Sequence, residues 1–107
     1  MQSKATSSAA LLETMMLVRA FEHQNAALAA AGHAPGTCTS VGQEAAAVGV
    51  VMGLGRQDLI LTNHRSAGHL LARGADPGRV LSTKQSAGRL PRKCAGIAAS
   101  SCSVKVS

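Results

Sequence analysis

The sequence is nearly devoid of aromatic residues: Phe21 is the one aromatic side chain, and there is no tryptophan or tyrosine. Large side chains normally supply most of the burial that stabilises a core. A chain of 107 residues is also small, and a domain of that size buries only about 60–70% of its unfolded surface. We therefore expect marginal stability. The shortage of aromatic rings also argues against a single-strand nucleic-acid binder, which needs stacking platforms for the bases.

Long apolar runs and a secretory signal are missing as well. No apolar run approaches the roughly 20 residues of a membrane-spanning helix, which excludes an integral membrane protein. The N-terminus has no apolar stretch followed by a cleavage site. Cysteine is sparse and odd in number, which does not fit a disulfide framework. The three cysteines are Cys38, Cys94 and Cys102. The sequence therefore predicts a protein of the reducing cytoplasm.

Acidic residues are absent from residues 79–107, which carry six of the 11 Lys and Arg residues. Residues 1–78 hold five acids and five bases, so the formal net charge of +6 comes from the basic end. Such an end either binds nucleic acid or an acidic partner through counterion release, or is a solvated terminus. We favour the solvated terminus and do not expect nucleic-acid binding, since no aromatic residue accompanies the bases.

Apolar periodicity predicts a first helix over residues 9–31. Leu11, Met15 and Val18 share one face at helical spacing, and we interpret that face as core. Gly32 is placed to end the helix. The apolar residues beside this face are Leu17, Phe21 and Leu28.

A second helix is predicted from about Gly42 to Leu54. Ser40 and Gln43 have the spacing of a capping box, in which the two side chains satisfy free backbone groups at the helix start. Small residues then recur on one face, and because glycine is costly inside a helix, we expect this face to make a close contact. These residues are Gly42, Ala46, Gly49 and Gly53.

The region after this helix predicts an α/β arrangement. Residues 55–58 read as a turn, and residues 59–62 form a short apolar run that predicts a buried strand. Helices are expected over residues 67–73 and from Asp76-Pro77, where an N-cap precedes a proline at the first helical position. One strand cannot make a sheet, so further strands must come from elsewhere.

The densest polar cluster follows the predicted strand. Arg65 lies between strand and helix with His64 beside it, and a guanidinium near helix N-terminal amides suits a phosphate or carboxylate. An ordinary exposed loop remains the alternative. His64 and His69 do not have metal-pair spacing, so we expect no metal site. Glu44 either follows the helix dipole or forms a buried bridge to a base.

Taken together, these motifs resemble a known family. They are M-L-V-R-A-F-E over residues 16–22, S-V-G-Q-E-A over residues 40–45 and H-R-x-x-G-H over residues 64–69, with Asp76-Pro77 behind them. In this order they are similar to the N-terminal part of the alpha subunit of thiamine-diphosphate-dependent 2-oxo acid dehydrogenases, above all pyruvate and acetoin dehydrogenase E1 alpha chains. The resemblance covers about residues 11–82.

The resemblance implies an α/β thiamine-binding fold with a parallel sheet, in an alpha-beta heterotetramer. It implies an enzyme that decarboxylates a 2-oxo acid or cleaves acetoin, and passes the acyl group to a lipoyl-bearing E2 partner. Carried over by motif position, His64 and Arg65 would bind the cofactor diphosphate, and the segment from Gly42 to Glu44 would support the active-site wall and the contact with the E1 beta subunit. No catalytic residue is carried over.

The chain departs from the family at several positions. The histidine expected shortly before Gly42 is missing, Ala67 stands where the family often has another histidine, and the G-D-G…N element that binds the cofactor's Mg²⁺ is absent. We divide the chain into a dehydrogenase part, residues 1–82, and a basic Ser/Gly-rich tail, residues 83–107, interpreted as disordered or frame-shifted. We expect the isolated chain to be inactive. A non-catalytic module that packs through the Gly/Ala helix is the alternative.

Overall fold

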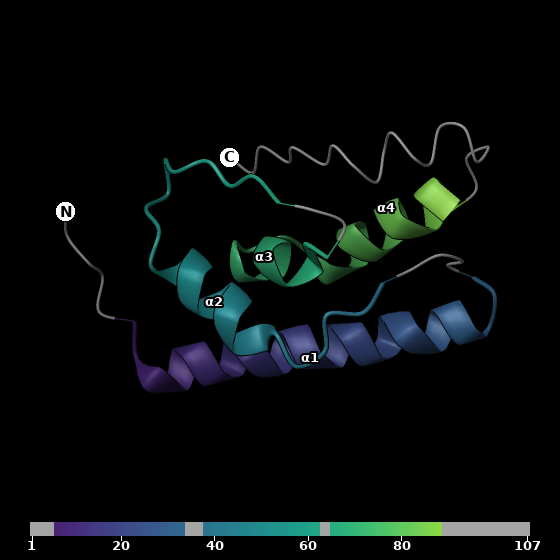
Figure 1. Ribbon diagram of the computed structural model, residues 1–107, viewed down its shortest axis with the longest axis horizontal. Helices are drawn as coiled ribbons and strands as arrows, with labels where there is room; N and C mark the ends of the chain where they lie inside the picture. Colours follow the sequence, from purple (N-terminus) through teal and green to yellow (C-terminus); the bar gives the residue numbers. More distant parts are fainter. Residues whose placement is uncertain (1–5, 34–37, 63–64, 89–107) are drawn as a thin grey trace.

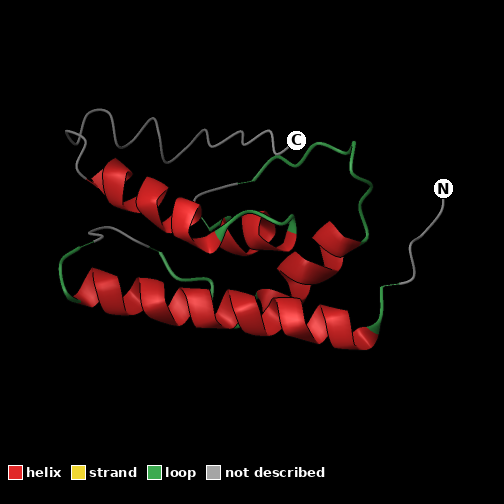
Figure 2. Cartoon of the chain, turned by 180° about the vertical axis from the view of Figure 1, so that it is seen from behind, coloured by secondary structure: helices red, strands yellow, loops and turns green. Residues whose placement is uncertain are grey.

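The computed structural model describes residues 6–33, 38–62 and 65–88, the last six without their side chains. All regular structure in these ranges is helical (Figures 1 and 2). The helices are α1 (Ser8–Ala30), α2 (Glu44–Met52), α3 (Ala67–Ala72) and α4 (Pro77–Gly88). The long α1 contacts α2 and α3, which also pack on each other, and α4 contacts α3. None of the described helices combines the length and apolar character that a membrane crossing requires.

Both ends of α1 follow local sequence signals. The side chain of Ser7 accepts a hydrogen bond from the amide of Ala10 at 3.2 Å, which caps the first turn. At the other end Gly32 has a φ of +82°, a conformation that favours glycine. The amide of His33 donates to the carbonyl of Leu28 at 2.9 Å, which closes the helix end. The predicted stop at Gly32 is confirmed.

The predicted helices of the second half are also confirmed. A carboxylate oxygen of Asp76 accepts a hydrogen bond from the amide of Arg79 at 3.0 Å, and Pro77 is the first residue of α4. Gly74, with a φ of +98°, follows the end of α3 just as Gly32 follows α1. These short signals place the helix boundaries because each involves residues within one turn of each other.

The core lies where α1, α2 and α3 meet and extends to the first turns of α4. Its buried residues are Val18, Phe21, Val48, Ala67, Leu71 and Val80, and the half-buried Leu11 and Met15 pack against them. The predicted apolar face of α1 is therefore confirmed. Leu17 is the exception, since 44% of it is exposed. Like Met16, it lies on the face of α1 that points away from the other helices.

Gly68 lies where α3 approaches both α1 and α2 closely. A Cβ atom at this position would lie 3.2 Å from Cγ1 of Val18 and 3.3 Å from Cβ of Ala47. Both distances are tighter than ordinary van der Waals contact, so a side chain fits here only if Val18 and Ala47 move away by a few tenths of an ångström. Through this position α3 packs onto α1 and α2 together.

The small-residue face of α2 does not make the predicted close contact within the described chain. Gly42, Ala46, Gly49 and Gly53 are all exposed, and nothing lies within 4 Å of a Cβ added at Gly49. The helix buries its other face, because Glu44, Ala47, Val48 and Val51 follow the i, i+3, i+4, i+7 pattern toward the core. Within the described residues no other helix approaches this face, and the close contact expected of it stays a prediction.

The predicted strand at residues 59–62 is also absent, and the described ranges contain no strand at all. Leu59 is 80% exposed and Leu61 is 86% exposed, so the run is not buried. A strand exists only through hydrogen bonds to a neighbour, and the described part of the chain supplies none to residues 59–61. The fold shown is therefore mostly helical.

The predicted turn at residues 55–58 is confirmed. It is stabilised by the side chain of Arg73, which follows α3. The amide of Gly55 donates to the carboxylate of Asp58 at 2.7 Å. The guanidinium of Arg73 donates to three backbone carbonyls of this turn: those of Gly55 at 3.0 Å, Arg56 at 2.8 Å and Asp58 at 2.7 Å. One side chain therefore fixes the turn to the end of α3.

Replacing Arg73 with alanine should lower the free energy of unfolding by about 1–2 kcal/mol, because charge-assisted hydrogen bonds to three carbonyls are lost at a partly exposed site. Urea denaturation measures this loss. Arg73→Lys is the matched control, since it keeps the charge but not the planar fork, and it should recover only part of the loss. Equal stability of the alanine variant and the wild type would show that the three contacts contribute nothing.

Candidate functional site

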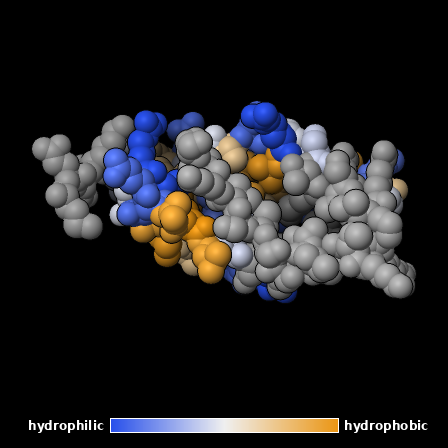
Figure 3. Space-filling view, turned by 90° about the horizontal axis from the view of Figure 1, so that it is seen from above, coloured by the Kyte–Doolittle hydropathy of each residue, from blue (hydrophilic) through white to orange (hydrophobic). Residues whose placement is uncertain are grey.

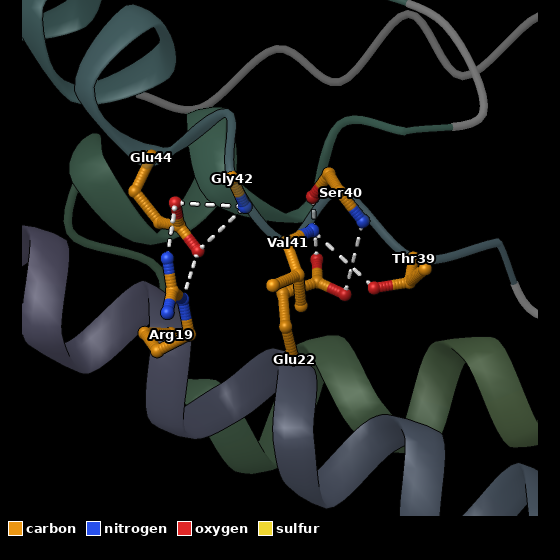
Figure 4. Close-up of polar contacts among 7 residues, drawn as sticks. All are labelled: Arg19, Glu22, Thr39, Ser40, Val41, Gly42 and Glu44. Carbon is orange, nitrogen blue, oxygen red and sulfur yellow. Dashed lines mark hydrogen bonds and ion pairs between the residues drawn. The ribbon is translucent and has the colours of Figure 1, made fainter.

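The connection between α1 and α2 is held by two carboxylates, one from each helix (Figure 4). Glu44, at the start of α2, turns back toward the connection. Its oxygens accept hydrogen bonds from the amide of Gly42 at 3.0 and 3.2 Å. The guanidinium of Arg19 on α1 binds the same carboxylate in a fork, with Nε on Oε1 and Nη2 on Oε2, the latter at 3.2 Å. Of the two readings of Glu44, the bridge to a base is therefore confirmed.

The environment keeps Glu44 ionised. The hydrogen bond from Arg19, followed by those from the amides of Glu44 and Gly42, lowers the pKa of the Glu44 carboxyl to about 2, although burial acts in the opposite direction. The same hydrogen bond raises the pKa of Arg19 above its usual value. Glu44 is only 5% exposed, whereas the Arg19 side chain is 48% exposed. The pair thus joins a buried carboxylate to a guanidinium at the surface.

Glu22 is the second carboxylate and is almost fully buried, with 1% of it exposed. The hydroxyl of Ser40 donates to Oε1 of Glu22 at 2.8 Å, and the Ser40 amide lies 3.5 Å from Oε2. The predicted capping box is therefore wrong. The Ser40 hydroxyl is engaged by Glu22, α2 begins at Glu44, and Gln43 makes no side-chain cap hydrogen bond.

Between these two anchors the backbone makes a tight turn. The amide of Gln43 donates to the carbonyl of Ser40 at 3.0 Å, and Gly42 has a φ of +93°. A residue with a Cβ would be strained there. The role of Glu22 could not be found in the sequence, because 18 positions separate it from Ser40 and no local pattern links the two.

Two further polar groups lie in the helix interface without a hydrogen-bond partner in the described part of the chain. They are the Asn25 carboxamide, which is completely buried, and Nδ1 of His69. Asn25 lies one turn beyond Glu22 on α1. An unsatisfied buried polar group costs about 1–3 kcal/mol. Within the described ranges, no three His, Cys, Asp or Glu side chains come close enough to share a metal ion.

The predicted diphosphate site is described only in part. Arg65 is exposed and directly precedes Ser66, the residue before α3. His64 lies outside the described residues, so the structure does not show whether the two side chains meet. An exposed guanidinium beside a helix start is suited to the oxygens of a diphosphate. The assignment of His64 and Arg65 to cofactor binding stays a prediction.

Comparison with known families identifies the class of protein. The sequence model of the family described as Dehydrogenase E1 component matches residues 13–100, which include α2, α3, α4 and most of α1. The chain belongs to the Dehydrogenase E1 component family. Comparisons with curated proteins and with solved structures each gave no significant match. The family match confirms the resemblance to the E1 component of 2-oxo acid dehydrogenases.

Membership sets the chemical context of the site. The family comprises thiamine-diphosphate-dependent enzymes of the oxidoreductase type, which generally work in complexes with other subunits. The match covers the Glu22 and Glu44 anchors as well as Arg65. It also runs past residue 82, and the division of the chain at that residue stays a prediction.

Proposed function

We propose that the chain is the N-terminal part of the alpha subunit of a thiamine-diphosphate-dependent 2-oxo acid dehydrogenase of the pyruvate type, or of an acetoin dehydrogenase. The observation that carries this proposal is the family match over residues 13–100. In this role the subunit lies in the cytoplasm and belongs to an α/β fold with a parallel sheet. With an E1 beta subunit it acts on the substrate and passes the acyl group to a lipoyl-bearing E2.

The residues of this chain would serve to bind and position the cofactor. Arg65, with His64 beside it in sequence, would hold the diphosphate, and the exposure of Arg65 supports this role. When bound, thiamine diphosphate supplies the nucleophilic carbon that adds to the substrate's oxo group. The connection over residues 38–43, held by Glu22 and Glu44, would form a fixed wall near the cofactor.

Calorimetric titration of the 107-residue chain with Mg²⁺ and thiamine diphosphate tests whether this chain alone can bind the cofactor. We expect no binding in the micromolar range, because these residues include no magnesium-binding element. Micromolar binding by the chain alone would contradict the expectation that these residues hold only part of the cofactor site. Arg65→Ala, compared with Arg56→Ala at another exposed arginine, then shows whether any weaker binding involves Arg65 or only general positive charge.

A non-catalytic interaction module remains the second candidate, and the exposure of the small-residue face of α2 favours it. Co-purification with an E1 beta subunit supports the first candidate. If that partner does not bind, the alpha-subunit assignment fails and the interaction module is preferred. Gly49→Leu adds bulk at a position with open space around it, so in either case it reports whether this face contacts the partner.

A further inference from the structure

The face of α1 opposite the core has no partner within the described part of the chain. Figures 1 and 2 show the other helices on one side of α1 only. Large apolar side chains nevertheless lie on the uncovered side, where Leu12 is 56% exposed, Met16 is 64% exposed and Leu17 is nearly half exposed. A single exposed apolar residue is ordinary on a protein surface. Three of them between residues 12 and 17 of one helix indicate a contact surface.

A line of exposed residues runs along this face at the spacing of a helix–helix contact. Its positions are separated alternately by four and three residues, the 3.5-residue repeat with which one helix meets another. The residues that bury α1 in the core form a different set, so the core does not account for this repeat. We call the line the outer seam, and its members are Ala9, Glu13, Met16, Ala20, His23 and Ala27, all of them exposed.

The outer seam is complementary to itself when a second copy runs in the opposite direction. In an antiparallel pair centred midway between Met16 and Ala20, Met16 faces the partner's Ala20, so a long side chain meets a small one. In the same arrangement Glu13 faces the partner's His23, and a carboxylate meets an imidazole that donates a hydrogen bond to it. The alanines near the two ends of the seam also face each other. Two-fold symmetry makes each of these contacts occur twice.

We propose that the outer seam binds a second copy of this chain as an antiparallel pair of α1 helices, an interaction that does not depend on the proposed function. A parallel pair is disfavoured, because Glu13 would then face Glu13 and His23 would face His23. Polar residues in such a seam set the direction of pairing at a cost in stability. A membrane surface is a poorer occupant, because the sequence of α1 contains no lysine with which to reach anionic lipids.

The dimensions of the outer seam limit the affinity. A stable interface of standard size buries about 800 Å² per partner, whereas this seam is one helix wide and half of its positions are alanine. The two polar layers contribute direction more than affinity. We therefore expect a weak, reversible dimer with a dissociation constant on the order of 100 µM.

Sedimentation equilibrium of the 107-residue chain, from about 10 µM to about 1 mM, brackets this constant and measures the association directly. Met16→Glu should weaken association at least 10-fold, because it buries a carboxylate against the partner's Ala20 without a compensating charge. The fold should not change, since Met16 is exposed and glutamate is a good helix former. Thermal unfolding of the dilute variant should therefore match that of the wild type.

The chain offers a matched control at another apolar surface. Apolar residues also gather at the end of the molecule that carries α2 (Figure 3). Val50 of α2 is 60% exposed, close to the exposure of Met16. Val50→Glu therefore makes the same kind of change outside the outer seam, and this variant should associate as the wild type does.

A charge exchange tests the antiparallel register. His23→Glu brings two carboxylates together at each end of the pair and should weaken association by about 3- to 10-fold, because the repulsion occurs twice. Adding Glu13→Lys to this variant places a lysine opposite each new glutamate and should restore the wild-type association. In a parallel pair the double variant would bring like charges together at both positions and would restore nothing.

Three results would overturn the proposal. The first is a wild type that stays monomeric at the highest concentration. The second is Met16→Glu associating as strongly as the wild type, whether or not Val50→Glu weakens the association. The third is a double variant that associates no better than His23→Glu, which would exclude the antiparallel register. The cofactor titration tests the proposed function separately, so the two can fail independently.

Discussion

Gly68→Leu should destabilise the folded chain by about 3 kcal/mol, because overfilling a packed interface at this level of confinement costs about that much. A Cβ alone would lie 3.2 Å from Val18 and 3.3 Å from Ala47. Val18 is 1% exposed and Ala47 is 7% exposed, so neither has free space to move into. In a small, marginally stable domain such a loss is expected to leave a substantial unfolded population.

Chemical denaturation followed by circular dichroism measures the effect, and the chain offers a matched control. Gly49 also lies inside a helix, but nothing surrounds its position within 4 Å. Gly49→Ala should therefore stabilise the chain by about 0.5–1 kcal/mol through helix propensity alone. If Gly68→Leu and Gly49→Leu unfold at the same denaturant concentration, the close approach at Gly68 does not hold the helices together.

Glu44→Ala should lower the free energy of unfolding by about 2 kcal/mol, the typical loss for hydrogen bonds to a charged group. The variant leaves the Gly42 amide without its acceptor and removes the bridge between α2 and α1. Because half of the Arg19 side chain is exposed, solvent screens the ion pair, and we attribute most of the loss to the Gly42 amide, which loses its charged acceptor. Glu13→Ala, at an exposed glutamate on α1, is the control and should be nearly neutral.

The pH dependence gives an independent check on Glu44. Its folded-state pKa of about 2 lies below the ordinary value of 4.5 for a glutamate carboxyl. A depressed pKa contributes stability that is present above the unfolded value and is lost as the pH falls through the folded value. The wild type should therefore lose this contribution between about pH 4.5 and pH 2. Glu44→Gln should lack that component, and parallel stability curves for the two proteins would contradict the assigned bridge.

The sequence predicted those features that depend on residues close together in the chain. Gly32 ends α1 because its backbone adopts a left-handed conformation, and Asp76 starts α4 because its side chain reaches an amide three residues on. The apolar face with Val18 follows from helical spacing. Each of these signals lies within one or two helical turns, so the sequence alone contains the necessary geometry.

The features that were missed depend on distant residues. Ser40 fits a helix cap by spacing, yet Glu22 engages its hydroxyl from another helix. Arg73 gave no sequence signal for its role, because its partners are backbone carbonyls some 15 to 18 positions away. The run at residues 59–62 has strand composition, but composition cannot supply a neighbour. The assignment of Arg65 to cofactor binding rests on local chemistry and stays a prediction. A bridge from Glu44 to a base was one of two readings of the sequence, whereas the Glu22 anchor gave no sequence signal.

The two carboxylate anchors have a consequence for local opening. Ser40 is tied to the helix before the connection, and Gly42 is tied to the first residue of the helix after it, which is itself paired with Arg19. The connection cannot separate from α1 while α2 stays packed on it, because the Glu44 carboxylate binds both the Gly42 amide of the connection and the Arg19 guanidinium of α1. Although it has the outward form of a surface loop, this segment belongs to the same cooperative unfolding unit as the two helices it joins.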